Sequence, residues 1–310
     1  MRKLLFSAIG TAFSVFLYAQ QDPQFSQNMH NRLFPNPGVA GSNNAICGTL
    51  LGRQQWMGFT GQPKTYLLSV HAPVRLLHGG AGLSIAQDEL GNEKTFGLKA
   101  AYAYRLTIGI GELGIGTAAG MVNKSIGSDP WKANDQNDLV IPQNNSGKTG
   151  FDLDFGLYYK TPALFLGLST THLTQSQLKD AGKNLNYKVA RHYYVMAGYN
   201  HNFKSFPLAL QPMVFVKSDA ASTQVDINVV AIYNNLVWVG VSYRVQDAIA
   251  PMVGVQKDLG PGTLKFGYSY DVTTSILKQY SSGSHEIMLG YCFNMPDQNQ
   301  TGKHKTVRFL

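Results

Sequence analysis

The feature that most constrains how this chain can fold is a two-residue alternation of apolar and polar side chains through residues 46–293. In FDLDFGLYY, residues 151–159, every odd-numbered residue is apolar, whereas Asp152 and Asp154 fall on the opposite face. Side chains alternate between the two faces of a β-strand, so the pattern predicts a protein built of strands. Helical periodicity is nearly absent, so lipid or a second sheet must cover the apolar face.

The alternating segments predict fourteen strands separated by turns and loops. Their expected ranges are 46–56, 62–72, 79–87, 94–106, 110–124, 149–160, 163–171, 190–203, 207–218, 223–233, 236–245, 249–257, 263–271 and 284–293. Most have about the 9–11 residues that a tilted membrane-spanning strand needs. An even number of such strands is typical of an all-β fold, the antiparallel up-and-down β-barrel of bacterial outer membranes.

The composition favours this barrel over a secreted, soluble β-sandwich. Only 14% of the residues are charged, against about 25% in typical soluble domains. The chain also has 32 glycines, 16 tyrosines and 16 phenylalanines. Few charges combined with many of these residues fit a membrane barrel better than a soluble domain. The net charge of +8 includes no dense basic run, so it does not indicate nucleic-acid binding.

The lengths of the predicted connections support the barrel independently. If the first strand starts in the periplasm, the long connections 125–148, 172–189 and 272–283 all fall on the outer side. Connections on the other side are short, such as 161–162 and 234–235. Long outer loops and short periplasmic turns are the known asymmetry of outer-membrane barrels. A soluble sandwich offers no reason for this sorting.

Residues 1–19 have the three parts of a secretory signal peptide. The start, MRK, is basic, residues 4–17 are mostly apolar, and Ala19 ends a cleavage-site pattern. The apolar run is short for a spanning helix, which makes an uncleaved N-terminal anchor the weaker alternative. We therefore expect an exported protein of the cell outer membrane.

Between the leader and the first strand, residues 20–45 form an irregular segment that contains three prolines. Such a backbone cannot lie in lipid, because its polar groups would lack hydrogen bonds. The segment must lie either in the barrel lumen, as a plug, or in the periplasm. Its apolar residues are candidates for contact with the barrel or with a partner: Phe25, Met29, Leu33 and Phe34.

The polar face of the strands carries charges of both signs. They are Arg53, Lys99, Arg105, Glu112, Lys124, Asp152, Asp154, Lys160, Asp226, Arg244, Lys265, Asp271 and Glu286. A fourteen-stranded barrel encloses a lumen of roughly 15 Å, which is too wide for its own side chains to fill. Two interpretations stay open here. The charges pair with one another around a plug, or they line a water-filled channel.

The motifs give no support for an enzyme, a cofactor or a metal site. GIGELG, residues 109–114, matches a dinucleotide-binding pattern, but that motif requires a βαβ unit that is not predicted here. Its glycines fit better a strand that curves or that another backbone approaches closely. The chain has no H-E-x-x-H and no G-x-S-x-G motif. We therefore expect no catalytic, cofactor-binding or metal-binding residues.

The two cysteines predict a covalent link between the ends of the barrel. Cys47 lies near the start of the first strand and Cys292 near the end of the last. Barrel closure makes these strands neighbours, and the alternation directs both sulfurs inward. Exported proteins meet an oxidising compartment, so we predict a disulfide. Two free, buried thiols are the alternative.

Several stretches of the chain resemble the PorP/SprF family. They are QDPQFSQ, NPGVAGS and GRQQWMGFTGQPKTYLLSVHAPV near the start, and YSYDV and GSHEIMLGY near the end. The resemblance implies an outer-membrane β-barrel of the type IX secretion and gliding machinery of Bacteroidota. It implies a role in binding or anchoring secreted surface proteins or periplasmic secretion partners, and no catalysis. A general diffusion porin is the alternative function.

After the last strand, residues 294–310 form a polar, basic tail that we interpret as a periplasmic extension. This tail and the connection after the first strand supply the remaining candidates for contact with partners. These candidates are Lys303, Lys305, Arg308, Trp56 and Phe59.

Overall fold

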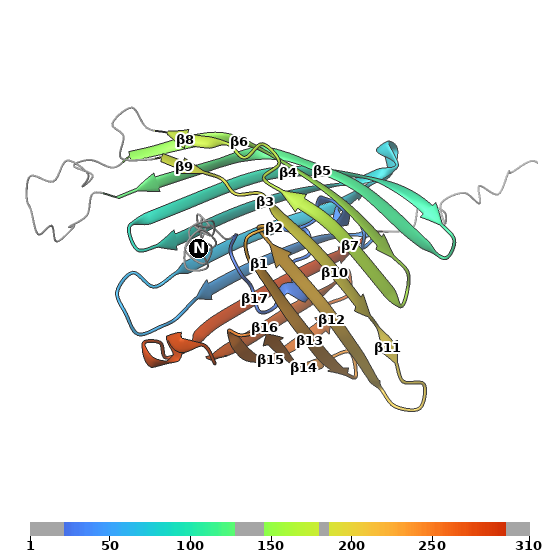
Figure 1. The fold of residues 1–310 in the computed structure, drawn as a ribbon. Coiled ribbons are helices and arrows are strands. Elements are labelled where there is room, and N and C mark those ends of the chain that lie inside the picture. The colour runs from blue at the N-terminus through green and yellow to red at the C-terminus, as the bar shows by residue number, and fades with distance from the viewer. Residues whose placement is uncertain (1–21, 128–145, 180–185, 296–310) are drawn as a thin grey trace, which may run out of the picture.

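Residues 22–127, 146–179 and 186–295 are described by the computed structural model of the protein. In this part of the chain, antiparallel strands close into a single barrel (Figure 1). The predicted signal peptide and the basic residues of the tail lie outside the described residues. No helix in the described ranges is long and apolar enough to cross a membrane.

The observed strands begin and end within a few residues of the predicted ranges. They are β1 (Ala45–Gln54), β2 (Lys64–Val74), β3 (Gly79–Leu90), β4 (Glu93–Ile108), β5 (Gly111–Ile126), β6 (Ser146–Lys160), β7 (Leu164–Thr171), β10 (His192–Tyr199), β11 (His201–Asn202), β12 (Leu208–Ser218), β13 (Thr223–Tyr233), β14 (Val237–Arg244), β15 (Ala248–Asp258), β16 (Gly262–Thr273) and β17 (Ser284–Asn294). Because β10 and β11 pair with the same neighbour, β12, they form one barrel strand. The described residues therefore contain fourteen barrel strands.

Short elements occur outside the barrel wall. A two-stranded sheet of β8 (Gln177–Lys179) and β9 (Asn186–Lys188) lies in the connection between β7 and β10. The 3-10 turns are η1 (Asn28–His30), η2 (Pro37–Val39), η3 (Arg75–Leu77) and η4 (Ile276–Gln279).

The barrel closes because the first and last strands pair. β1 is hydrogen-bonded to β2 on one side and to β17 on the other, with Ala45 opposite Asn294 and Gln54 opposite His285. Every barrel strand thus has two neighbours, which leaves no unsatisfied sheet edge in contact with lipid. The prediction of a closed, fourteen-stranded antiparallel barrel is confirmed.

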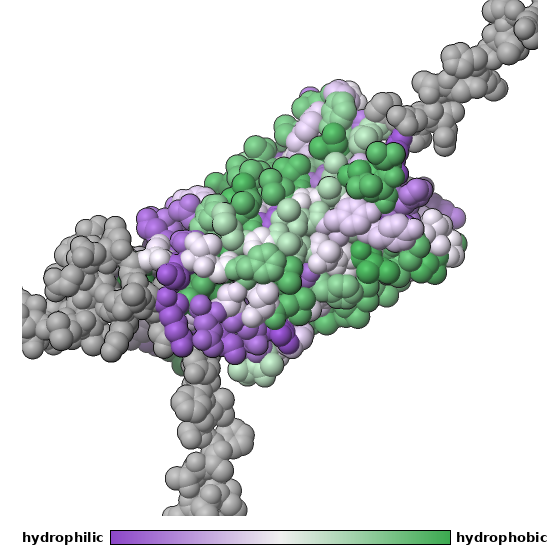
Figure 2. All heavy atoms as spheres, turned by 90° about the horizontal axis from the view of Figure 1, so that it is seen from above, coloured by the Kyte–Doolittle hydropathy of each residue, from purple (hydrophilic) through white to green (hydrophobic). Residues whose placement is uncertain are grey.

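The alternation in the sequence separates a lipid-facing surface from the lumen. In β13, Ile227 and Val229 are exposed on the outside, whereas the side chains of Asp226 and Asn228 between them are buried inside. Figure 2 shows apolar residues over the middle of the wall and hydrophilic residues mainly toward its ends. Such a band is what the hydrocarbon core of a bilayer requires.

The inner face also carries apolar residues that the alternation did not indicate. Leu51, Trp238 and Met288 are almost fully buried and pack in one cluster with Phe25 and Met29. Apolar side chains turned toward a lumen are stable only when something apolar covers them. In this barrel the chain N-terminal to β1 provides the cover.

Candidate functional site

Residues 22–44, called here the lumenal segment, run along the inside of the barrel before the chain enters β1 (Figure 1). The segment starts at the end of the barrel that carries the long connections 127–145 and 274–283, which we call the outer end. It reaches the opposite, periplasmic end beside the short connection 161–163. Gln27 and Asn36 have no exposed surface at all.

The four apolar candidates of the irregular segment lie within the lumen. Phe25, Met29 and Leu33 are buried. Phe34 is partly buried against the cluster that contains Phe25 and Met29. The rings of Phe25 and Phe34 meet edge to face, with their centroids 6.2 Å apart. These contacts anchor the segment by burying apolar surface.

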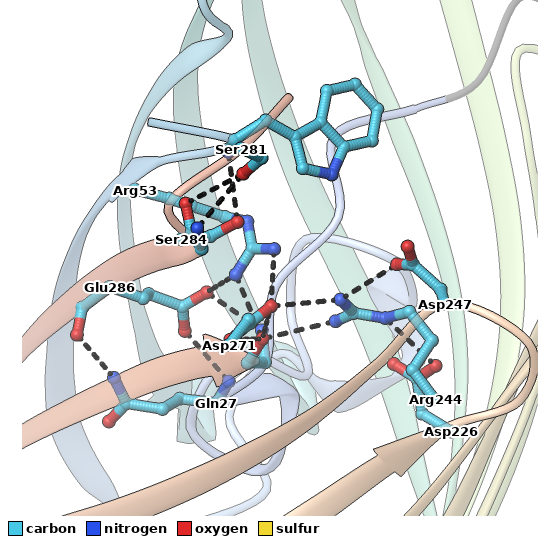
Figure 3. A network of polar contacts seen from close by, with 12 residues as sticks. Gln27, Arg53, Asp226, Arg244, Asp247, Asp271, Ser281, Ser284 and Glu286 are labelled. Carbon is cyan, nitrogen blue, oxygen red and sulfur yellow. Dashed lines mark hydrogen bonds and ion pairs between the residues drawn. The ribbon is translucent and has the colours of Figure 1, made fainter. Parts of the chain in front are cut away.

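Five charged residues, each from a different strand, form the outer ion cluster and hold the segment near its start (Figure 3). The cluster consists of Arg53, Asp226, Arg244, Asp271 and Glu286, each at most 2% exposed. Arg53 contacts Asp271 at 2.7 Å and Glu286 at 3.0 Å. Arg244 contacts Asp271 at 3.1 Å and Asp226 at 3.3 Å.

The lumenal segment adds hydrogen bonds to this cluster. The backbone amides of Ser26 and Gln27 each donate to a carboxylate oxygen of Glu286 at 2.8 Å. The hydroxyl of Ser26 donates to Asp271 at 2.7 Å and accepts from Arg53 at 2.9 Å. Buried charges are tolerated only when paired and hydrogen-bonded, so the cluster and the segment stabilise each other.

A second polar group, the histidine cluster, binds the first described residue of the segment. One oxygen of Asp22 lies 2.8 Å from Nε2 of His172, whose Nδ1 lies 2.6 Å from Asp152. The other Asp22 oxygen accepts from the hydroxyl of Tyr194 at 2.6 Å. Nζ of Lys99 sits 2.9 Å from Asp152 and 2.8 Å from Asp154.

His172 follows β7 and lies between two carboxylates, which determines its protonation. Burial lowers the pKa of His172, but the Asp22 carboxylate and the hydrogen bonds to Asp22 and Asp152 outweigh it and raise the pKa to about 9. The imidazole is then a cation at neutral pH. It joins the lumenal segment to the barrel wall by a charge-assisted bridge.

The histidine cluster also has ligand atoms close enough together for a metal ion. They belong to two overlapping sets, Asp22, His172 and His192, and Asp152, Asp154 and His172. However, Lys99 already places a cation between the two carboxylates of the second set. The protonated His172 similarly neutralises the first. The arrangement therefore fits a set of ion pairs better than a metal centre.

Toward the periplasmic end, the backbone of the segment lies directly on glycines of the wall. A Cβ atom added to Gly116 would lie 2.4 Å from the backbone nitrogen of Gly38, and one added to Gly156 would lie 2.1 Å from Oδ1 of Asn36. The same Oδ1 accepts from the amide of Gly38 and thereby caps η2. This contact agrees with the interpretation that the glycine-rich stretch lets a second backbone approach.

Two further candidates for contact lie at the outer end of the barrel. Trp56 and Phe59 occupy the outer connection after β1, and the side chain of Phe59 is 45% exposed. The three basic candidates of the tail, Lys303, Lys305 and Arg308, lie outside the described residues.

The structure joins the two cysteines across the seam. Cys47 and Cys292 are opposite each other in the register of β1 and β17, and their sulfurs form a disulfide. Both face the lumen, as the alternation predicted. The oxidised state of the exported protein stays a prediction.

Sequence reasoning missed the polar anchors of the segment. Asp22, Ser26, His172 and His192 did not stand out, because each is an isolated polar residue in an irregular stretch or at a strand end. Only closure of the barrel brings together residues 150 positions apart, such as Asp22 and His172. No local motif marks such a contact.

Comparison with known proteins places the chain in one family. The family described as "Type IX secretion system membrane protein PorP/SprF" matches residues 17–291. No curated protein matches the sequence. Among solved structures, the CymD monoaromatic hydrocarbon channel is similar with a TM-score of 0.54 and 11% identity, over 86% of this chain and 93% of that one. The Ralstonia pickettii toluene transporter TbuX gives a TM-score of 0.50 and 14% identity, over 85% and 93%. At these identities the likeness concerns the fold alone.

Proposed function

This chain belongs to the PorP/SprF family of type IX secretion system membrane proteins and has the β-barrel fold of an outer-membrane protein, and from this premise we propose that it is a closed docking barrel. In this role it binds secreted surface proteins or periplasmic secretion partners through its two ends. Its lumen is not a route for diffusion.

The observation that supports this proposal is the fixation of the lumenal segment. Ser26 is held by the outer ion cluster, Asp22 by the histidine cluster, and Gly38 by the glycines of β5 and β6. A segment with three separate anchors is poorly suited to opening and closing as a simple gate. The attachment of the lumenal segment at three places favours a rigid barrel whose two ends make the functional contacts.

The periplasmic contact is proposed for the tail. Removal of residues 297–310 leaves the complete strand β17, so the barrel should still insert into the membrane. If the tail binds a periplasmic partner, crosslinked pull-down from intact cells should lose that partner, and export of surface proteins should fall. A triple variant with Lys303, Lys305 and Arg308 changed to Gln tests whether the basic charges are responsible. Normal export and unchanged crosslinks with normal barrel levels would contradict a role for the tail.

The outer contact is proposed for the connection that carries Trp56 and Phe59. Exposed aromatic residues are enriched at protein interfaces. Phe59→Ser should reduce the surface proteins recovered with the barrel, and Leu259→Ser, which changes an exposed residue at the periplasmic end, serves as the control. Equal recovery from both variants would count against this surface.

The alternative function, a general diffusion porin, makes the opposite prediction for the purified protein. A porin conducts steadily in planar bilayers, whereas a closed docking barrel is silent. Steady currents through the unmodified protein would favour the porin.

A further inference from the structure

Four cations gather in the periplasmic half of the lumen and are called here the basic cluster. Arg32 comes from the lumenal segment, and Arg105, Lys160 and Lys265 come from the inner faces of β4, β6 and β16. Lys160 is repelled by the other three and attracted by Glu112, and Lys265 is repelled by Arg32 and attracted by Asp258. Like charges in a poorly solvated lumen are costly unless an anion accompanies them.

Within the described residues, these cations meet mainly neutral oxygens. Arg105 donates to the carbonyls of residues 38–40 and is 3.9 Å from Glu112, whose side chain is 43% exposed. Lys160 donates to the carbonyl of Ser42 and to Asn43.

The remaining two cations have even fewer partners. In the same described ranges, Lys265 has no hydrogen bond or ion pair, and the nearby Asp258 is exposed and accepts from Thr263. Arg32 donates through Nη1 to the hydroxyl of Tyr158, and its buried Nε has no partner. By contrast, each arginine of the outer ion cluster contacts at least two carboxylates.

A cavity of about 170 Å³ adjoins this cluster. Arg32 and Lys160 line it together with Phe165 and Met213, and it extends to the periplasmic connection 161–163. The guanidinium of Arg32 lies on the ring of Phe165, 3.8 Å from its centroid. This stacking fixes the plane of the guanidinium and leaves the edge with Nε free for a paired, planar acceptor.

We propose that this cavity is an anion site that receives the carboxylate of an acidic side chain on a peptide segment entering from the periplasm. Arg32 supplies the paired donors, and Lys160 and Lys265 supply the surrounding positive charge. The partly apolar lining suits the short hydrocarbon stem of Glu or Asp. A lipid headgroup fits less well, because Arg32, which supplies the paired donors, belongs to the lumenal segment inside the barrel. The proposal does not rest on the export role, since it concerns binding by the purified barrel.

The test is calorimetric titration of the purified, full-length barrel with an acetylated tetraglutamate amide. The matched tetraglutamine peptide is the uncharged control. Binding of tetraglutamate should weaken about tenfold or more in Arg32→Gln and by a smaller factor in Lys265→Gln, which does not line the cavity, and it should weaken with added salt. Lys257→Gln removes a cation from an exposed position near the same end and should bind like the unmodified protein. Heat-modified mobility in gels verifies that each variant is folded.

Three outcomes would overturn the assignment. One is equal binding of tetraglutamate and tetraglutamine, and another is unchanged binding in both lumenal variants that have folded. The third is displacement of the peptide by a different anion. If inorganic phosphate, or phosphatidylglycerol in nanodiscs, displaces the peptide at equal concentration and depends on Arg32, the site belongs to phosphate or to lipid. Tetraglutamate binding that depends on Arg32 and Lys265 and resists both competitors supports a peptide carboxylate.

Discussion

Arg53 in β1 and Glu286 in β17 are opposite each other in the register that closes the barrel, with Nη1 and Oε2 3.0 Å apart, and both bind Ser26 of the lumenal segment. Closure of the wall and retention of the segment therefore depend on the same pair of charges. Barrel closure brings the pair together, and the segment then occupies the hydrogen-bonding positions that the pair leaves open.

Loss of Arg53 should destabilise the barrel strongly. In Arg53→Gln, Glu286 loses its ion pair and Asp271 keeps only Arg244, so the free energy of unfolding should fall by about 3–5 kcal/mol. Urea unfolding in lipid vesicles measures this. Lys94→Gln removes an ion pair whose lysine side chain is 61% exposed, and it should change stability by about 1 kcal/mol or less. Similar losses in the two variants would show that the outer ion cluster contributes no more than a surface pair.

The lack of a side chain at Gly116 should be required for a closed lumen. Gly116→Val places a side chain where the backbone of η2 lies, so the segment must shift and the barrel should conduct in planar bilayers. Gly97→Val is the matched control, because nothing lies within 4 Å of a Cβ atom added to Gly97. Equal currents from the two variants would contradict a backbone contact that seals the lumen.

The bridge between His172 and Asp22 should weaken in alkali. The pKa of His172 is raised from 6.5 to about 9, so its stabilising effect is fully present below about pH 6.5 and disappears as pH rises through about 9. A spin label introduced by Gln24→Cys should become mobile over that upper range. In a background with His172→Gln, the label should be mobile throughout. Mobility that does not depend on pH in the labelled parent would reject this bridge.

The seam disulfide should be found in protein purified from the outer membrane. Non-reducing mass spectrometry should give one linked peptide that contains Cys47 and Cys292, because both residues face the lumen at paired positions. Cys47→Ser should remove the linked peptide and lower stability by about 2–5 kcal/mol. Alkylation of both thiols under denaturing, non-reducing conditions would show that the pair is reduced.

The sequence by itself determined the wall of this protein. Period-two alternation specifies strands and their faces through local geometry, and strand length and loop asymmetry specify a spanning barrel. Closure also makes the first and last strands neighbours, which led to the prediction of a Cys47–Cys292 disulfide, but the register that sets the two residues opposite each other came from the structure. The features of the wall need no knowledge of which distant residues meet.

The tertiary structure alone decided what fills the lumen. Residues 22–44 have no regular period, so their course depends on long-range contacts such as Ser26 with Glu286 and Gly38 with Gly116. The inward-facing Leu51 and Trp238 are understood only with Phe25 against them. Likewise, the ion pairs of the outer end and the weakly paired cations of the periplasmic end depend on the path of the segment. A local pattern can assign a residue to the lumen, but only the folded chain decides which residue it meets there.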